Sequence, residues 1–203
     1  MVTRRKKGDI ALANLLHEVR ACRHCEADLP LGPNPVVRGE SGARLLIIGQ
    51  APGTAVHKSG IPWDDPSGVR LRQWLDIDTA TFYDESRLAI MPMGFCYPGK
   101  GKSGDLPPSP DCAPLWHERI LAQLPRVELT LLVGSYAQAH YLGRSKENLT
   151  QRVQRWQDFA PRYLPLPHPS PRTSLWLKRN PLFDQQVVPQ LQTRISQFLD
   201  CRK

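Results

Sequence analysis

The chain has 203 residues, enough for one domain with a sizeable core. Hydrophobic residues make up 40% of it and charged residues 23%, which excludes a wholly disordered chain. No apolar run approaches the roughly 18 residues of a membrane helix and none follows the basic start, so we expect a cytoplasmic protein that contacts no membrane and contains no disulfide scaffold.

The net charge of +8 is distributed unevenly along the chain. Residues 1–10 carry +3 and residues 144–180 carry +6, so the remainder is close to neutral. A basic surface favours a polyanionic partner because each neutralised phosphate releases counterions, although a merely solubilising face has the same composition. We expect residues 1–8 to form a flexible basic arm and residues 9–203 to form a single domain.

The predicted elements begin with a helix over residues 9–20, where apolar residues recur at helical spacing. A buried strand over residues 44–48 follows a Pro-rich connector and ends in a Gly-Gln-Ala-Pro-Gly loop. Residues 67–75 are predicted as a helix with Ser67 as its N-cap, and residues 88–91 as a second short buried strand.

The second half of the chain continues this alternation. Its predicted elements are loop 97–111, helix 112–124, strand 129–133, helix 135–142, helix 149–159, strand 163–166 and a last helix over about 184–199. Strands that alternate with helices predict an α/β fold with a parallel sheet covered on both faces. Ligands bind beyond the carboxyl ends of such strands, where residues 49–53, the loop after Met91 and residues 168–172 fall.

Four cysteines have a spacing typical of a metal centre. Two residues separate Cys22 from Cys25, so a short loop can aim both sulfurs at one centre. Cys96 and Cys112 lie on either side of a loop rich in Pro and Gly. Zinc and an iron–sulfur cluster both accept four thiolates, and the pattern alone favours neither. Core cysteines and a redox pair are the alternatives, and Cys201 is expected to be a spare thiol.

Two loops carry side chains suited to catalysis. The segment 60–68 reads Gly-Ile-Pro-Trp-Asp-Asp-Pro-Ser-Gly, in which Trp63 can stack on a base and Asp64 or Asp65 can act as a base or an anion. An Asp-capped turn is the alternative interpretation. His168 lies on a loop stiffened by prolines, beside a hydroxyl and an arginine, and a purely structural histidine has the same local pattern.

The order of these motifs, with a late His-Pro-Ser, resembles the bacterial and archaeal iron–sulfur uracil-DNA glycosylases of families four and five. The resemblance covers about residues 20–198 and is closer to family five in its Asp-x-Ser-Gly motif. It implies a three-layer α/β/α sandwich around a four-stranded parallel sheet and a [4Fe–4S] cluster, with zinc as the alternative. It also implies a base-excision-repair hydrolase that flips a damaged base out of DNA and cleaves its N-glycosidic bond, and we expect a monomer.

The resemblance assigns a role to individual residues. The metal ligands it implies are Cys22, Cys25, Cys96 and Cys112. The water-positioning and base-binding residues are Gln50, Ala51, Pro52 and Gly53, with Trp63 stacking on the base. The catalytic residues are Asp65 and His168, with Asp64 as the second choice of carboxylate. The residues of the loop in the DNA minor groove are Pro169, Ser170, Pro171 and Arg172.

Three positions depart from the better-known relatives. Ala51 stands where the best-known uracil glycosylases have Asp, and Gln50 is neutral where family four has a carboxylate. Pro92, placed by its spacing to Cys96, stands where many have an Asn, and proline donates no hydrogen bond. The resemblance therefore implies a wider or different set of deaminated bases. The alternatives are a non-catalytic iron–sulfur protein that recognises damaged or single-stranded DNA, and a zinc-stabilised hydrolase or nucleotide-binding domain.

Overall fold

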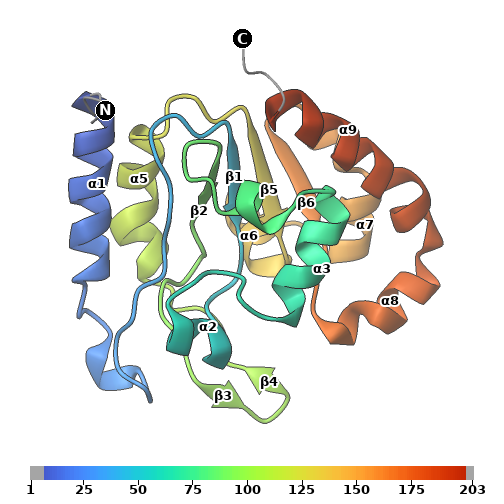
Figure 1. The fold of residues 1–203 in the computed structure, drawn as a ribbon. Helices are drawn as coiled ribbons and strands as arrows, with labels where there is room; N and C mark the ends of the chain where they lie inside the picture. The colour runs from blue at the N-terminus through green and yellow to red at the C-terminus, as the bar shows by residue number, and fades with distance from the viewer. Residues whose placement is uncertain (1–6, 200–203) are drawn as a thin grey trace.

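The structure, a computed structural model, describes residues 7–199 and is built around a four-stranded parallel sheet. The strands, in the spatial order β2-β1-β5-β6, are β1 (Leu45–Ile48), β2 (Leu88–Ile90), β5 (Leu129–Val133) and β6 (Tyr163–Leu166). Apart from Tyr163 their side chains are buried, as parallel strands covered on both faces require. The predicted three-layer α/β fold is confirmed (Figure 1).

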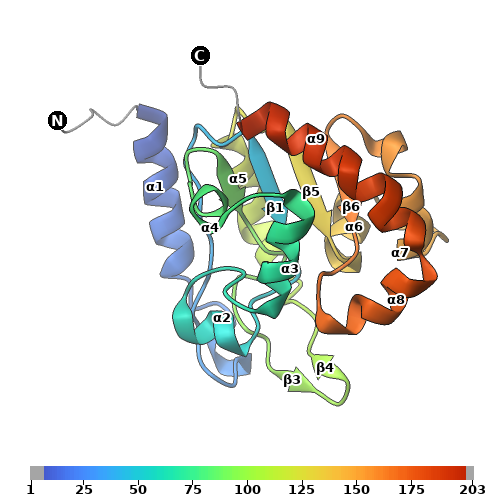
Figure 2. The ribbon, with the colours of Figure 1, turned by 45° about the vertical axis from the view of Figure 1, so that its right-hand side comes forward.

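Helices cover both faces of the sheet (Figures 1 and 2). One layer contains α1 (Lys7–Arg20), α5 (Glu118–Ala122) and α6 (Ser135–Tyr141), and the other contains α3 (Pro66–Leu75), α7 (Leu149–Gln154) and α9 (Val188–Leu199). Successive residues of β1 alternate between the two cores, because side chains of a strand point to opposite faces. Leu45 and Ile47 belong to the core under α3 and α9, whereas Leu46 and Ile48 belong to the core under α1 and α5.

Shorter elements complete the chain. They are η1 (Glu26–Asp28), α2 (Thr54–Ser59), α4 (Thr79–Phe82), the hairpin β3 (Lys100–Gly101) and β4 (Gly104–Asp105), η2 (Ala113–His117), η3 (Trp156–Phe159), η4 (Pro171–Thr173), α8 (Ser174–Arg179) and η5 (Phe183–Val187). Figure 1 places α2 and the hairpin together at one end of the sheet. In the described part of the chain, no helix is long and apolar enough to cross a membrane.

Several local predictions were wrong. The predicted loop 97–111 contains the β3–β4 hairpin, and α2, α4 and α8 are additional helices of four to six residues, too short to show a full apolar period. The N-cap of α3 is Asp65 rather than Ser67: the Asp65 carboxylate accepts a hydrogen bond from the Gly68 amide at 2.8 Å. Pro66 then takes the first helical position, where its missing N–H has no cost.

Two further differences concern the bounds of helices. The predicted helix 149–159 breaks at Arg155 into α7 and the 3-10 turn η3, because apolar spacing over one turn does not separate the two helix types. The first helix begins at Lys7, inside the segment predicted as a basic arm. Residues 1–6 of that arm, and Cys201, lie outside the described residues.

A buried histidine joins one helical layer to the end of β2. His117 is 2% exposed, and its Nε2 donates a hydrogen bond to the Pro92 carbonyl at 3.1 Å. A carbonyl only accepts, so Nδ1 of the neutral ring accepts from the Tyr141 hydroxyl at 2.7 Å. Burial lowers the pKa of His117 to about 4, and this imidazole therefore stays neutral while it fixes the Pro92 loop.

We expect the free energy of unfolding to fall as the pH is lowered from about 6.5 to about 4. The unfolded chain protonates His117 in this window and the folded protein does not, which amounts to about 3 kcal/mol. Urea unfolding at a series of pH values, on the wild type and His117→Gln, measures the effect as the difference between the two curves. Parallel curves would contradict it.

Candidate active site

A cavity of about 560 Å³ lies at the carboxyl ends of the parallel strands. The loop 49–53 after β1, Pro92 after β2 and His168 after β6 all contribute to its wall. This is the expected position of a ligand site in a parallel sheet, at the edge where the strand-to-helix loops converge.

The cavity brings together most of the predicted site residues. Those that line it are Gln50, Ala51, Pro52, Gly53, Trp63, Asp65, His168, Ser170, Pro171 and Arg172. Two predicted residues, Asp64 and Pro169, are not part of its lining, and Asp64 is exposed. Pro92, the departure noted in the sequence, does line it.

Trp63 forms one wall of the cavity, and its position depends on close packing against two glycines. Its backbone is left-handed, with φ 60°, and its indole covers Gly49 so closely that a Cβ there would lie 2.8 Å from the ring. A Cβ on Gly68 would lie only 1.8 Å from the Trp63 carbonyl oxygen. The two glycines therefore let the indole sit at the end of β1, with its ring centroid 5.8 Å from that of His168.

His168 is held by the loop that follows β6. Its carbonyl accepts from the Thr173 hydroxyl, and the next turn is fixed by Arg70, which donates to the Ser170 carbonyl at 2.7 Å. Burial lowers the pKa of His168 below its ordinary value, while the nearby carboxylates of Asp65 and Asp105 oppose this shift. The imidazole is therefore neutral at pH 7 and can donate one N–H into the cavity.

Asp65 combines the two roles that the sequence left open. Its Oδ1 caps α3 through the Gly68 amide, and the residue also lines the cavity. One carboxylate oxygen is thus used locally, and Oδ2 has no such partner among the described residues. A carboxylate anchored in this way is a fixed negative charge beside the ligand.

The hairpin supplies residues that the sequence analysis missed. Lys100, Ser103, Gly104 and Asp105 line the cavity, next to Gly53 of the first loop and Arg172 of the loop after β6. The Arg172 guanidinium donates to the Ser103 carbonyl, and a Cβ on Gly104, whose φ is 141°, would lie 2.6 Å from that guanidinium. The Gly-Lys-Gly-Lys-Ser-Gly stretch signals a turn, but only the contact with Arg172 places this turn at the cavity.

The four predicted metal ligands converge at a second, smaller cavity. Cys22, Cys25, Cys96 and Cys112 all line it, half-buried and without disulfide bonds. Burial raises the pKa of Cys96 to about 11, and the charges of the three other sulfurs act in the same direction. Four thiolates at such a place require a compensating cation, so the donor set fits a metal centre.

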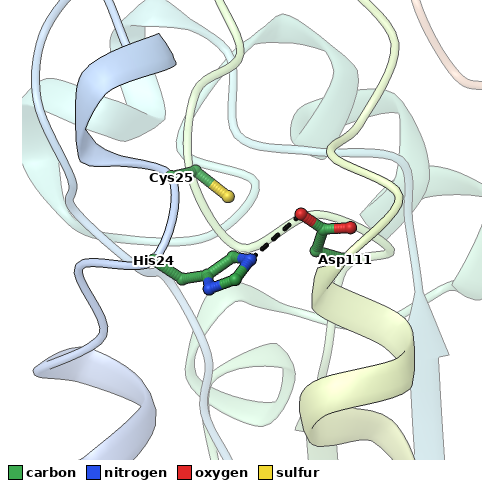
Figure 3. A group of neighbouring side chains, drawn as sticks. All are labelled: His24, Cys25 and Asp111. Carbon is green, nitrogen blue, oxygen red and sulfur yellow. Dashed lines mark hydrogen bonds and ion pairs between the residues drawn. The ribbon is translucent and has the colours of Figure 1, made fainter.

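Cys25 also belongs to a different group of possible ligands (Figure 3). His24 Nε2 lies 3.1 Å from Asp111 Oδ2, and these atoms and the Cys25 sulfur lie within 4.8 Å of one another. Across residues 7–199, no three cysteine sulfurs approach as closely. Two sulfurs on one tetrahedral zinc lie about 3.8 Å apart, since each Zn–S bond is about 2.3 Å. In this ligand-free arrangement no three of the described cysteine sulfurs lie close enough to share one zinc ion.

The basic stretch 144–180 is partly neutralised within the fold. Arg152 is buried and donates to the Gly143 carbonyl, while Arg155 pairs with Glu147 and Asp158. Besides the paired Arg155, the exposed basic side chains of this stretch are Arg144, Lys146, Arg162, Arg172, Lys178 and Arg179. The surface available to a polyanion is therefore smaller than the charge count suggests.

One comparison with known proteins bears on this site. A sequence model of the uracil DNA glycosylase superfamily matches residues 36–192, most of the chain. The matched part contains every residue that lines the large cavity, together with Cys96 and Cys112. Cys22 and Cys25 precede it.

Proposed function

The chain belongs to the uracil-DNA glycosylase superfamily, and we propose that it is a monofunctional DNA-repair enzyme that hydrolyses the N-glycosidic bond of uracil or another deaminated base. Membership makes it a DNA glycosylase, and thus a hydrolase that acts on DNA. The observation that carries the finer proposal is the cavity at the strand ends. It unites an aromatic wall, a fixed carboxylate and a neutral imidazole.

Base recognition begins with extrusion from the duplex, which costs a few kcal/mol and least for a mismatched base. Trp63 offsets part of this cost, because stacking of a base on an aromatic ring is worth about 1–3 kcal/mol. Two hydrogen bonds hold the loop that follows His168 before DNA binds: Arg70 donates to the Ser170 carbonyl, and Arg172 donates to the Ser103 carbonyl. This loop enters the duplex at Ser170 and Arg172 with little ordering cost.

Cleavage leaves positive charge on the sugar and negative charge on the departing base. Asp65 stabilises the sugar cation and orients the attacking water from its place beside the cavity. His168, neutral because of its burial, donates a hydrogen bond to a carbonyl oxygen of the base as charge develops there. Both electrons of the N-glycosidic bond leave with the base, the water oxygen bonds to C1′, and the proton that the water loses ends on the departed base.

The cavity wall supports a base range other than uracil alone. Ala51 and Pro92 both line the cavity, and neither has a side chain that can hydrogen-bond to a base edge. The Pro92 carbonyl already accepts from His117. Gln50 is the only member of the first loop with a polar side chain on the cavity, and an amide both donates and accepts. Because the Gln50 amide can donate or accept, it can hydrogen-bond to more than one deaminated base.

The four cysteines are proposed to hold a [4Fe–4S] cluster. Their convergence at one cavity supports a single centre with four thiolate ligands, and the resemblance to the iron–sulfur glycosylases favours a cluster over zinc. The cluster would cross-link the end of α1 to both ends of the segment that carries the hairpin, a structural contribution. No redox step is required for hydrolysis.

His168→Ala is expected to lower the rate of base release by about 10²–10³-fold, the usual loss for one donor that stabilises a developing anion. The assay counts abasic sites in duplexes with uracil, hypoxanthine, xanthine or no lesion, under single-turnover conditions. His17→Ala, an exposed histidine on α1, is the matched control and should retain the wild-type rate. Equal rates for wild type and His168→Ala would remove His168 from the mechanism.

A further inference from the structure

The first loop of the cavity has no acidic side chain, but an acidic side chain from the β3–β4 hairpin lies beside it. Residues 50–53 are Gln, Ala, Pro and Gly. Asp105, at the end of β4, lines the same cavity, and its Oδ2 lies 3.6 Å from the position that a Cβ on Gly53 would occupy. The hairpin therefore supplies a carboxylate at the place where the first loop has none.

The Asp105 carboxylate is chemically uncommitted. Within residues 7–199 it has no hydrogen-bond or ion-pair partner, and the residue is exposed. Asp65, by contrast, uses one oxygen to cap α3. An uncommitted carboxylate in contact with water can accept a proton without loss of a structural interaction.

The hairpin nevertheless holds Asp105 in place. Asp105 pairs with Lys100 across the two strands, and the Leu106 amide donates to the Gly99 carbonyl at 2.9 Å. Arg172 ties the turn to the loop after His168 through the Ser103 carbonyl. Because Arg172 belongs to the proposed DNA-binding loop, the position of Asp105 is coupled to the segment that meets the substrate.

We propose that Asp105 is a second catalytic residue, the general base for the attacking water, while Asp65 stabilises the sugar cation. This proposal rests on the proposed glycosylase function. In the step, the water oxygen bonds to C1′, its proton passes to the Asp105 carboxylate, and the N-glycosidic bond breaks with both electrons on the base. Asp105 then returns the proton to the departed base through solvent, so protons and electrons balance. The influence of both carboxylates on the His168 imidazole supports their placement around one reaction centre.

The test compares single-turnover base release by the wild type, Asp105→Asn and Asp105→Ala, with affinity for abasic-site duplex measured in parallel. Loss of the Asp105 general base should lower the rate of base release by about 10²-fold or more, with unchanged affinity for the abasic-site duplex. Added sodium formate should restore part of the rate to Asp105→Ala, because the position is open to solvent, whereas sodium chloride at equal ionic strength should not. Asp184→Asn, an exposed carboxylate on η5, controls for the change in net charge.

The possible outcomes distinguish the role of Asp105 from the glycosylase function. A wild-type rate for Asp105→Asn would overturn the role of Asp105 and leave the glycosylase intact. A slower variant that binds abasic-site DNA more weakly and does not respond to formate would show that Asp105 only docks the hairpin, which also overturns the proposal. If the wild type releases no base from any lesion, the proposed function itself fails, and the role of Asp105 with it.

Discussion

Asp65→Asn is expected to lower the rate of base release by on the order of 10³-fold and to leave DNA binding and folding unchanged. This substitution removes the charge of Asp65 and keeps its structural role. Asparagine is as good an N-cap as aspartate, so its Oδ1 can keep the 2.8 Å hydrogen bond from the Gly68 amide. Only the negative charge beside the sugar is lost. The measurement is single-turnover base release together with the affinity for lesion-bearing duplex.

The matched control is Asp78→Asn. Asp78 caps α4 in the same manner, accepting from the Thr81 amide at 2.7 Å, and is not part of the cavity lining. It should retain the wild-type rate. Asp65→Ala separates the two roles of Asp65: it should be as slow as Asp65→Asn and also less stable by about 1 kcal/mol through loss of the cap. Cleavage by Asp65→Asn at the wild-type rate would show that the charge is not catalytic.

Cys96→Ser is expected to abolish the metal centre and to lower the free energy of unfolding by more than about 4 kcal/mol, since loss of a structural metal is among the most damaging substitutions. Cys96 and Cys112 flank the segment that carries the hairpin. Without the centre, Lys100 and Asp105 lose the anchor that holds them at the cavity, so base release should fall as well. Metal analysis, visible absorbance and urea unfolding measure the three effects.

Two controls define the centre. Cys201→Ser, at a thiol that the cluster assignment does not use, should keep about four iron atoms per chain. The double variant His24→Ala and Asp111→Ala removes the alternative three-ligand group around Cys25 and should keep them too. Anaerobically purified wild type with one zinc and no iron would contradict the cluster. If the double variant loses its metal and Cys96→Ser keeps it, the metal is bound by the group in Figure 3 instead.

The fold was predictable because each strand has a recognisable local sequence pattern. Four short, mainly apolar runs, each followed by Gly or Pro, became the four parallel strands, and the observed β6 matches residues 163–166. A run that is apolar at every position is typical of a strand buried on both faces, which in turn requires helices above and below. The position of the cavity followed from the same rule, since the loops after parallel strands meet at one edge.

The missed features depend on contacts between residues that are distant in sequence. Asp105 is one of several polar residues in a Gly-rich stretch, and only the bond from Arg172 to Ser103, 69 positions apart, brings its hairpin to the cavity. His117 carries no local sign that it fixes Pro92. Asp65 shows the reverse limitation: the sequence offered capping and catalysis as alternatives, and the geometry allows both in one side chain.

Detection of the released base is the decisive measurement of glycosylase activity. Anaerobically purified protein would be incubated with duplexes that contain uracil, hypoxanthine, xanthine or no lesion, and the free bases and abasic sites would be quantified by mass spectrometry. We expect one free base for each abasic site, from at least one deaminated base and not from undamaged DNA. Tight binding to a lesion without release of any base would contradict it and would assign the protein to non-catalytic recognition of damaged DNA.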